Sequence, residues 1–169
     1  ILGRLVGSEM CIRDRDDAKY GDYSQNPVMD MIVPTLFNPS MAPEGKHILS
    51  ANIMYIPYQK NDGWSEEDKN ELTERIIDTI SQYSPNIRDN ILHSELLTPL
   101  DLEKEFNLTG GHWHHGELAL DQMLMMRPTY EAAQYCTPID KLYLCSAGCH
   151  PGGGIMGAAG YNAAKEIIK

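Results

Sequence analysis

The sequence predicts an α/β protein with an α+β part, and three stretches of the chain carry this prediction. Residues 141–168 have the pattern strand, glycine-rich loop and helix, the local unit of α/β folds. Residues 48–58 alternate in polarity, which is typical of a half-buried antiparallel strand. Residues 65–83 carry apolar side chains at helical spacing behind an acidic first turn. We therefore expect two structural environments in one chain of 169 residues.

Charge divides the chain in a similar way. Residues 16–110 contain seven Lys and Arg against 17 Asp and Glu, a balance of −10. Residues 111–169 contain four against five, a balance of −1. The formal net charge of −10 argues against a nucleic-acid partner. No apolar run reaches the length of a membrane span, so we predict no transmembrane segment.

Residues 1–15, ILGRLVGSEMCIRDR, differ from the rest of the chain. They lack the acidic bias, and their apolar positions have no sustained period. They resemble translated sequencing-adaptor read-through, and they lack the apolar centre of a targeting signal. We expect this segment to be non-native, so that the true N-terminus is missing.

Two strands are expected at the start of the acidic part. Residues 28–37 form the first, which breaks at Pro34 because proline cannot donate to a sheet. Residues 38–47 are a Pro- and Gly-containing connection to the second strand, residues 48–58. One face of the second strand carries Leu49, Ala51, Ile53 and Tyr55.

A helix comes next, with Ser65 as its cap and Asp68 in the capping-box position. Its buried stripe is predicted to comprise Leu72, Ile76, Ile77, Ile80 and Tyr83. Pro85 ends it. Residues 90–97 are expected to form a short strand, and Thr98 and Pro99 to start a short second helix.

The stretch CHPGGGIMGAAG, residues 149–160, belongs to a region with six of the chain's 14 glycines. A predicted strand, residues 141–146, precedes it, and a helix whose buried face would include Ala164, Ile167 and Ile168 comes after it. Free N–H groups and the dipole at a helix start favour an anion such as a phosphate or a flavin. The alternative is a tight turn that packs the helix on the strand. Neither a Walker lysine nor a clean G-x-G-x-x-G pattern is present.

Metal-ligating side chains gather at His112, His114, His115 and Glu117. Their spacing fits no established metal pattern, so we predict no metal site and favour loop histidines bonded to backbone. His115 stays a candidate for a catalytic residue. The four cysteines, Cys11, Cys136, Cys145 and Cys149, also fit no zinc or redox spacing, and we expect reduced thiols.

An apolar run and an arginine come after the histidines. The run comprises Leu118, Leu120, Met123, Leu124 and Met126. It could fill a core or form the wall of an apolar ligand site. Arg127 could be buried against a carboxylate or phosphate, or lie at the surface.

Residues 98–128 and 137–164 resemble the FAD-dependent phytoene desaturase-like oxidoreductases, in particular the branch of pyridine nucleotide-disulphide oxidoreductase domain-containing protein 2. The block LYLCSAGCHPGGGIMGAAGYNAA carries the most specific part of this resemblance, which extends over residues 20–169. It implies a C-terminal fragment of a Rossmann-type FAD-binding fold plus a substrate domain built on an antiparallel sheet. Residues 16–110 would be the substrate-domain portion, and residues 111–169 the returning segment of the FAD-binding domain.

The resemblance also implies which residues contact the FAD cofactor. Ala147 and Gly148 would reach its ribityl and pyrophosphate region, and the last helix would begin near the flavin ring. The complete implied set is Ala147, Gly148, Gly152, Gly153, Gly154, Ile155, Met156, Gly157 and Ala158. Cys149, where the family is expected to have Thr, and Tyr161, where it is expected to have Arg, depart from the pattern.

The function that the resemblance implies is dehydrogenation or desaturation of an apolar small molecule, with hydride transfer to flavin. The partner would be the missing N-terminal half of the same protein. The resemblance implies an intracellular protein of the cytoplasm or mitochondria. Peripheral contact with a membrane stays an open alternative. The alternative is a non-catalytic fragment or binding module that cannot hold FAD without that half. A metal hydrolase based on the histidines would require stoichiometric metal.

Overall fold

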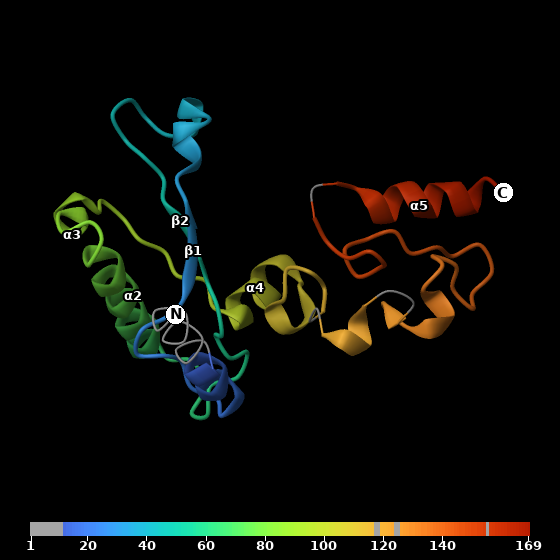
Figure 1. Cartoon of the computed structure of the whole chain (residues 1–169), viewed down its shortest axis with the longest axis horizontal. Helices are drawn as coiled ribbons and strands as arrows, with labels where there is room; N and C mark the ends of the chain where they lie inside the picture. Colours follow the sequence, from blue (N-terminus) through green and yellow to red (C-terminus); the bar gives the residue numbers. More distant parts are fainter. Residues whose placement is uncertain (1–11, 117–118, 124–125, 155) are drawn as a thin grey trace, which may run out of the picture. The chain divides into compact units, whose positions relative to one another are not determined.

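The computed structural model describes residues 12–116, 119–123, 126–154 and 156–169 (Figure 1). The chain divides into two compact units, one ending at Thr98 and the other beginning at Pro99. The first combines helices with a two-stranded antiparallel sheet. The mixture of helix and sheet agrees with the predicted α/β class at this coarse level.

The sheet of the first unit is a hairpin. Strand β1, Met29–Ile32, pairs antiparallel with β2, Ser50–Ile53 (Figure 1). The break at Pro34 is confirmed, because a 3-10 turn, η1 (Pro34–Leu36), begins there. The second strand is shorter than predicted, because Tyr55 has a φ of 58°, a left-handed conformation that an extended strand cannot contain.

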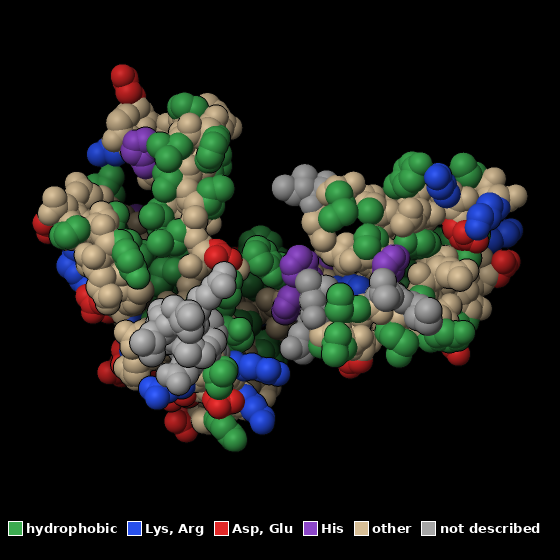
Figure 2. Space-filling view, viewed as in Figure 1, with side chains coloured by type: hydrophobic (Ala, Val, Ile, Leu, Met, Phe, Trp, Pro, Cys, Tyr) green, Lys and Arg blue, Asp and Glu red, His purple; other side chains and the backbone are tan. Residues whose placement is uncertain are grey.

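The connection between the strands is held by a buried hydroxyl but carries an apolar surface. After the second 3-10 turn, η2 (Pro39–Met41), the chain returns past Thr35, whose Oγ1 accepts a hydrogen bond of 3.3 Å from the Ile48 N–H. Figure 2 shows apolar side chains along the surface of this hairpin. The exposed ones are Met31, Ile32, Leu36, Phe37, Met41, Ile48 and Leu49.

Helix α2, Glu66–Ser81, begins as the sequence predicts. The Ser65 hydroxyl accepts from the Asp68 N–H at 3.1 Å, and the Asp68 carboxylate accepts from the Ser65 N–H at 3.0 Å. The buried positions are Leu72, Ile76 and Ile80. The prediction was wrong for Tyr83, which is 83% exposed. The helix ends at Ser81, so Tyr83 lies beyond it and does not continue the buried stripe.

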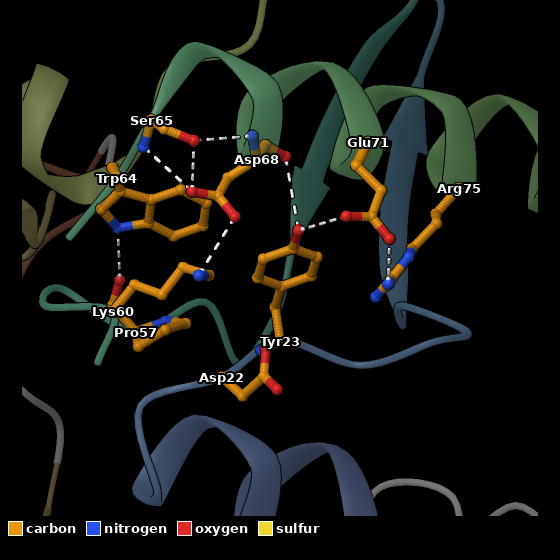
Figure 3. Close-up of polar contacts among 9 residues, drawn as sticks. All are labelled: Asp22, Tyr23, Pro57, Lys60, Trp64, Ser65, Asp68, Glu71 and Arg75. Atoms are coloured by element: carbon orange, nitrogen blue, oxygen red, sulfur yellow. Dashed lines mark hydrogen bonds and ion pairs between the residues drawn. The ribbon is translucent and has the colours of Figure 1, made fainter. Parts of the chain in front are cut away.

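The core of the first unit forms around Tyr23. Its ring stacks on Trp64 with centroids 5.5 Å apart, and the Arg75 guanidinium lies 4.9 Å from the ring centroid (Figure 3). The Trp64 indole N–H donates to the Pro57 carbonyl at 3.3 Å. Tyr23 thus joins the chain before the hairpin to the buried face of α2.

Residues 90–97 do not form the predicted strand. A short helix, α3 (Ile87–Asn90), occupies the start of the segment, and the described residues after it pair with no strand. Ile91 has extended dihedral angles, φ −76° and ψ 118°. Extended backbone becomes sheet only beside a partner strand, and the periodicity of a short segment does not reveal whether a partner exists.

The second unit consists of short helical elements joined by turns. The described elements are α4 (Pro99–Phe106), η3 (Thr109–Gly111), η4 (Leu120–Gln122), η6 (Tyr130–Ala132) and α5 (Ala158–Ile167). The helix start at Pro99 is confirmed. The predicted strand over residues 141–146 is wrong: among the described residues, its only sheet-type pairing is an isolated bridge between Cys136 and Tyr143. A single bridge satisfies too few backbone groups to make a strand.

Helix α5 buries a different face from the one predicted. Ala159 and Ala163, four residues apart, pack in a core with Tyr135 and Cys149. The predicted face of Ala164, Ile167 and Ile168 is exposed instead. Small alanine side chains let the helix approach the Tyr135 ring closely, which the larger isoleucines do not.

Candidate functional site

A small pocket lies where the glycine loop meets the start of α5. Its volume is about 190 Å³. The lining residues are Cys145, Ser146, Ala147, Gly152, Gly153, Gly154, Gly157, Ala158, Ala159 and Gly160. They come from three adjoining pieces of chain: the end of the apolar segment 141–146, the triple glycine, and the first turn of the helix. The wall is therefore made mostly of backbone.

Most of the residues predicted to contact a cofactor meet at this pocket. Six line it: Ala147, Gly152, Gly153, Gly154, Gly157 and Ala158. Gly148 and Met156 are not among the lining residues, and Met156 is 73% exposed. Ile155 lies outside the described residues. Cys145, Ser146, Ala159 and Gly160 line the pocket without having been predicted, and their direct sequence adjacency to the predicted set could have indicated them.

Glycine is required in this loop for two separate reasons. Gly154 has a φ of 140° and Gly157 a φ of 62°, conformations that side chains rarely allow. Gly153 is limited by space, because a Cβ there would overlap the His114 Nδ1 and lie 3.3 Å from the Ala147 Cβ. The loop thus brings bare backbone to the pocket, as the sequence predicts for a close approach.

The first turn of α5 gives the pocket a positive end. Gly157 is the N-cap, no side chain caps the helix, and no acidic residue stands in the first turn. The first N–H groups of a helix have no partner within it, and the helix dipole adds partial positive charge. This arrangement suits an anionic group placed in the pocket.

Tyr135 holds the loop and the helix together. Its hydroxyl donates to the His150 carbonyl and accepts from the Asn162 side-chain N–H, each at 2.8 Å. Its backbone carbonyl accepts from the Leu144 N–H at 2.8 Å. No sequence signal indicates this role, because a single tyrosine outside any motif has many possible uses.

Arg127 is buried against the pocket wall. Only 1% of it is exposed, so the surface alternative is wrong. Its guanidinium donates to the Ala147 carbonyl, at 3.0 Å from Nη2 and 3.3 Å from Nε, and Nη2 also donates to the His114 carbonyl. Arg127 therefore connects the histidine segment to a lining residue of the pocket.

The histidines bond mainly within their own turn. The His115 N–H donates to the His112 carbonyl at 2.8 Å, and the His114 N–H donates to the His112 Nδ1 at 3.2 Å. Among the described residues there is no group of three or more side chains that could hold a metal ion, and Glu117 lies outside them. His115 is exposed and does not line the pocket, so its catalytic role stays a hypothesis.

The thiols near the pocket differ in their surroundings. Cys149 is 2% exposed, and burial raises the pKa of its thiol. Cys145 lines the pocket and, like Cys136, is exposed. All three are free, whereas Cys11 lies outside the described residues.

The apolar run after the histidines is exposed where it is described. Leu120 is 89%, Met123 47% and Met126 45% exposed. Leu118 and Leu124 lie outside the described residues. The described side chains therefore fill no core within this chain.

Comparison with known proteins finds relatives that carry the names of oxidoreductases. It is 41% identical over 156 residues to the mouse (Mus musculus) protein named pyridine nucleotide-disulfide oxidoreductase domain-containing protein 2, a match that covers 91% of the chain and 27% of the relative. It is 31% identical over 130 residues to the lycopene-forming phytoene desaturase of Pantoea ananas, covering 75% and 25%. It is 29% identical over 116 residues to a component of the limonene dehydrogenase of Castellaniella defragrans, covering 68% and 21%.

These relatives define a class of oxidoreductases that includes desaturases and dehydrogenases. Within it, the chain belongs to the phytoene desaturase-like group, of the pyridine nucleotide-disulfide oxidoreductase domain-containing protein 2 type, which confirms the resemblance found in the sequence. The chain spans about a quarter of the length of these relatives. No protein-family model matches the sequence, and no solved structure is significantly similar. Among the described residues, no helix is both long and apolar enough to cross a membrane.

Proposed function

We propose that this chain is the C-terminal portion of an FAD-dependent oxidoreductase and contributes the glycine-loop side of its FAD site. The observation that carries the proposal is the pocket at the start of α5, where six residues implied by the family resemblance lie together. The similarity to relatives with oxidoreductase and desaturase names also supports it.

The residues present fit part of a flavin cofactor. A volume of about 190 Å³ is below the range of roughly 300–1,000 Å³ typical of complete small-molecule sites. The pocket therefore suits one anionic or ring portion of FAD, not the whole molecule. Gly154 and Gly157 would let the cofactor approach the backbone, and the N–H groups at the start of α5 would face its negative charge. The rest of the site would come from the N-terminal half of the parent protein.

When bound, FAD would supply the redox chemistry as the hydride acceptor. This chain's own contribution would be position and electrostatics. The helix N-terminus would favour negative charge by about 0.3–1 kcal/mol, and by more where water is excluded. Tyr135 would keep that helix in place against the His150 carbonyl.

The substrate is proposed to be an apolar small molecule. Relatives with the names phytoene desaturase and limonene dehydrogenase support this class, because both names refer to hydrocarbons. We further propose an intracellular setting, in the cytoplasm or in mitochondria, as the family resemblance implies.

Purification of the parent protein that contains this chain tests the proposal. We expect a yellow protein with flavin absorbance, from which denaturation releases FAD in about equimolar amount. A colourless parent that neither contains nor takes up FAD would contradict the proposal.

Titration of FAD into the isolated segment, residues 16–169, tests whether the chain holds only part of the site. Weak or sub-stoichiometric binding is expected. Tight equimolar binding would show that no further half is needed. No binding by the segment, together with a parent that lacks flavin, would favour the alternative of a non-catalytic binding module.

A further inference from the structure

A buried guanidinium outside the pocket connects two parts of its wall. Arg127 is among the largest fully buried side chains in the described part of the chain. Its fork donates to the carbonyl of Ala147, a lining residue, and to the carbonyl of His114. A guanidinium has five donors in a fixed plane, so it can serve two carbonyls at once with little loss of freedom.

The bond from Arg127 to the His114 carbonyl matters because the His114 ring leaves no space for a side chain at position 153. The His114 ring occupies the space that a side chain at Gly153 would need, and the Ala147 Cβ borders the same space at 3.3 Å. The two residues that Arg127 ties together are therefore the two that border the space beside Gly153. A change in the position of either would change the shape of the pocket.

We propose that Arg127 is the positioning residue of the glycine pocket, fixing the His114 segment and Ala147 against Gly153 through their backbone carbonyls. Arg127 does not line the pocket itself, and it acts through the two residues that it holds. The proposal concerns the geometry of the pocket, so it can be tested whether or not the ligand is FAD.

The reactivity of the Cys149 thiol can be used to follow the position of Ala147. Its N–H donates to the Ser146 carbonyl at 2.9 Å, which closes a turn that contains Ala147. The thiol is 2% exposed; burial raises its pKa, and the Arg127 charge lowers that pKa to a smaller extent. Loss of the Arg127 charge alone would therefore slow labelling, so faster labelling reports exposure of the thiol. Release of Ala147 should open this turn and expose Cys149, while the already exposed Cys136 is an internal reference.

The test measures iodoacetamide labelling of Cys149 relative to Cys136 by mass spectrometry, in the full chain. Arg127→Ala is expected to raise the relative rate about tenfold, and methylguanidinium in the buffer to bring it back towards the original value. Arg127→Lys should stay fast, because one ammonium cannot reproduce the fork. Arg88→Ala is the matched control, since Arg88 makes exposed ion pairs with Glu74 and Asp78 in the other unit.

Three outcomes would overturn the proposal: an unchanged rate in Arg127→Ala, a slow rate in Arg127→Lys, or no response to methylguanidinium. Far-UV circular dichroism is recorded for each variant. If Arg127→Ala loses its helical signal, the Arg127→Lys variant is used to test the proposal instead. Fast labelling of Cys149 in Arg127→Lys, at unchanged helicity, would support the proposal. A failure of FAD to bind the unsubstituted protein would count against the proposed function alone, because the thiol measurement uses no ligand.

Discussion

The hydrogen bonds of Asp68 lower the pKa of its own carboxyl group. Its carboxylate accepts from the Ser65 N–H at 3.0 Å and from the Ser65 hydroxyl at 2.6 Å, and it pairs with Lys60 at 3.1 Å (Figure 3). These bonds to Ser65, and then the one to Lys60, lower the pKa of Asp68 from 3.8 to about 2. The sequence predicts the pair with Ser65, three residues away. It does not predict Lys60, because that contact depends on the path of the preceding loop.

The lowered pKa of Asp68 predicts a loss of stability in acid. The unfolded chain binds a proton near pH 3.8 and the folded chain only near pH 2, so this stabilisation is present above about pH 4 and declines as pH falls towards 2. We expect Asp68→Asn to flatten the dependence of the unfolding free energy on pH between 4 and 2. Urea unfolding followed by Trp64 fluorescence, in a Trp113→Phe background, measures it.

Glu67→Gln is the control for Asp68→Asn. Glu67 lies in the same first helical turn and is exposed, so both changes remove a negative charge near the helix dipole. The expected difference between the two variants is confined to the acid range. Equal slopes of stability against pH in Asp68→Asn and the unsubstituted chain would contradict the assignment.

Gly153 makes a second prediction at the scale of single residues. In Gly153→Ala the new methyl group would displace the His114 ring and narrow the pocket, so the affinity of the parent protein for FAD should fall about tenfold, or about 1.4 kcal/mol, if the pocket is part of the FAD site as proposed. Gly45→Ala is the control for backbone strain, because Gly45 belongs to the first unit and has a left-handed φ of 72°, with nothing within 4 Å of a new Cβ. Released flavin per mole of protein is the measurement. Equal flavin content in both variants would argue against the pocket as part of the FAD site.

At the scale of elements, the turn η3 packs closely against the first residue of helix α4. Gly111 lies so close to the Pro99 carbonyl that an added Cβ would overlap it, and its φ is 65°. The adjacent Gly110 has a φ of 71° but open space around it. The sequence predicts the helix start at Pro99. The contact between Pro99 and Gly111 depends on the fold alone.

The two glycines therefore form a matched pair of substitutions. Gly110→Ala should cost about 1–2 kcal/mol, the strain of a left-handed conformation with a side chain. Gly111→Ala should cost a further 1–3 kcal/mol or so, because backbone atoms of Pro99 cannot move aside as a side chain can. The measurement is the free energy of unfolding in urea, monitored by the circular-dichroism signal of the whole chain. Equal costs for the two changes would exclude the close contact.

The sequence predicted the described helices better than the strands. Helix α2 carries its start signal and its buried stripe within its own residues, so local reasoning finds it. The segments 90–97 and 141–146 have apolar residues suited to strands, but a strand depends on a neighbour that the local pattern does not contain. In α5 the predicted face failed for a related reason: Ala159 and Ala163 are buried because of Tyr135, which is far away in sequence.

At the scale of the whole molecule, the two units have cores of different composition. Leucine, isoleucine and an aromatic stack fill the first, around Leu72 and Tyr23. The buried cluster of the second consists of Tyr135, Cys149, Ala159 and Ala163. Alanine buries little apolar area, so the second cluster gains less from the hydrophobic effect. The boundary predicted between residues 110 and 111, and the interleaved Rossmann-type arrangement, stay predictions.

This difference predicts the order of unfolding. In increasing urea, Cys149 should become reactive to a thiol reagent at a lower concentration than the one at which Trp64 fluorescence changes. The Trp113→Phe background assigns the fluorescence to the first unit. Coincident midpoints for the two probes would show that the smaller cluster is as stable as the larger one, contrary to the area argument.

Tyr135 also has a consequence for how this protein varies among related organisms. Its hydroxyl bonds a side chain at Asn162 but only a main-chain oxygen at His150. Natural selection acting on the contact should couple positions 135 and 162, so that a phenylalanine at the first accompanies loss of the amide at the second. The side chain at position 150 takes no part in the bond to the Tyr135 hydroxyl, so this bond does not restrict which residue stands there.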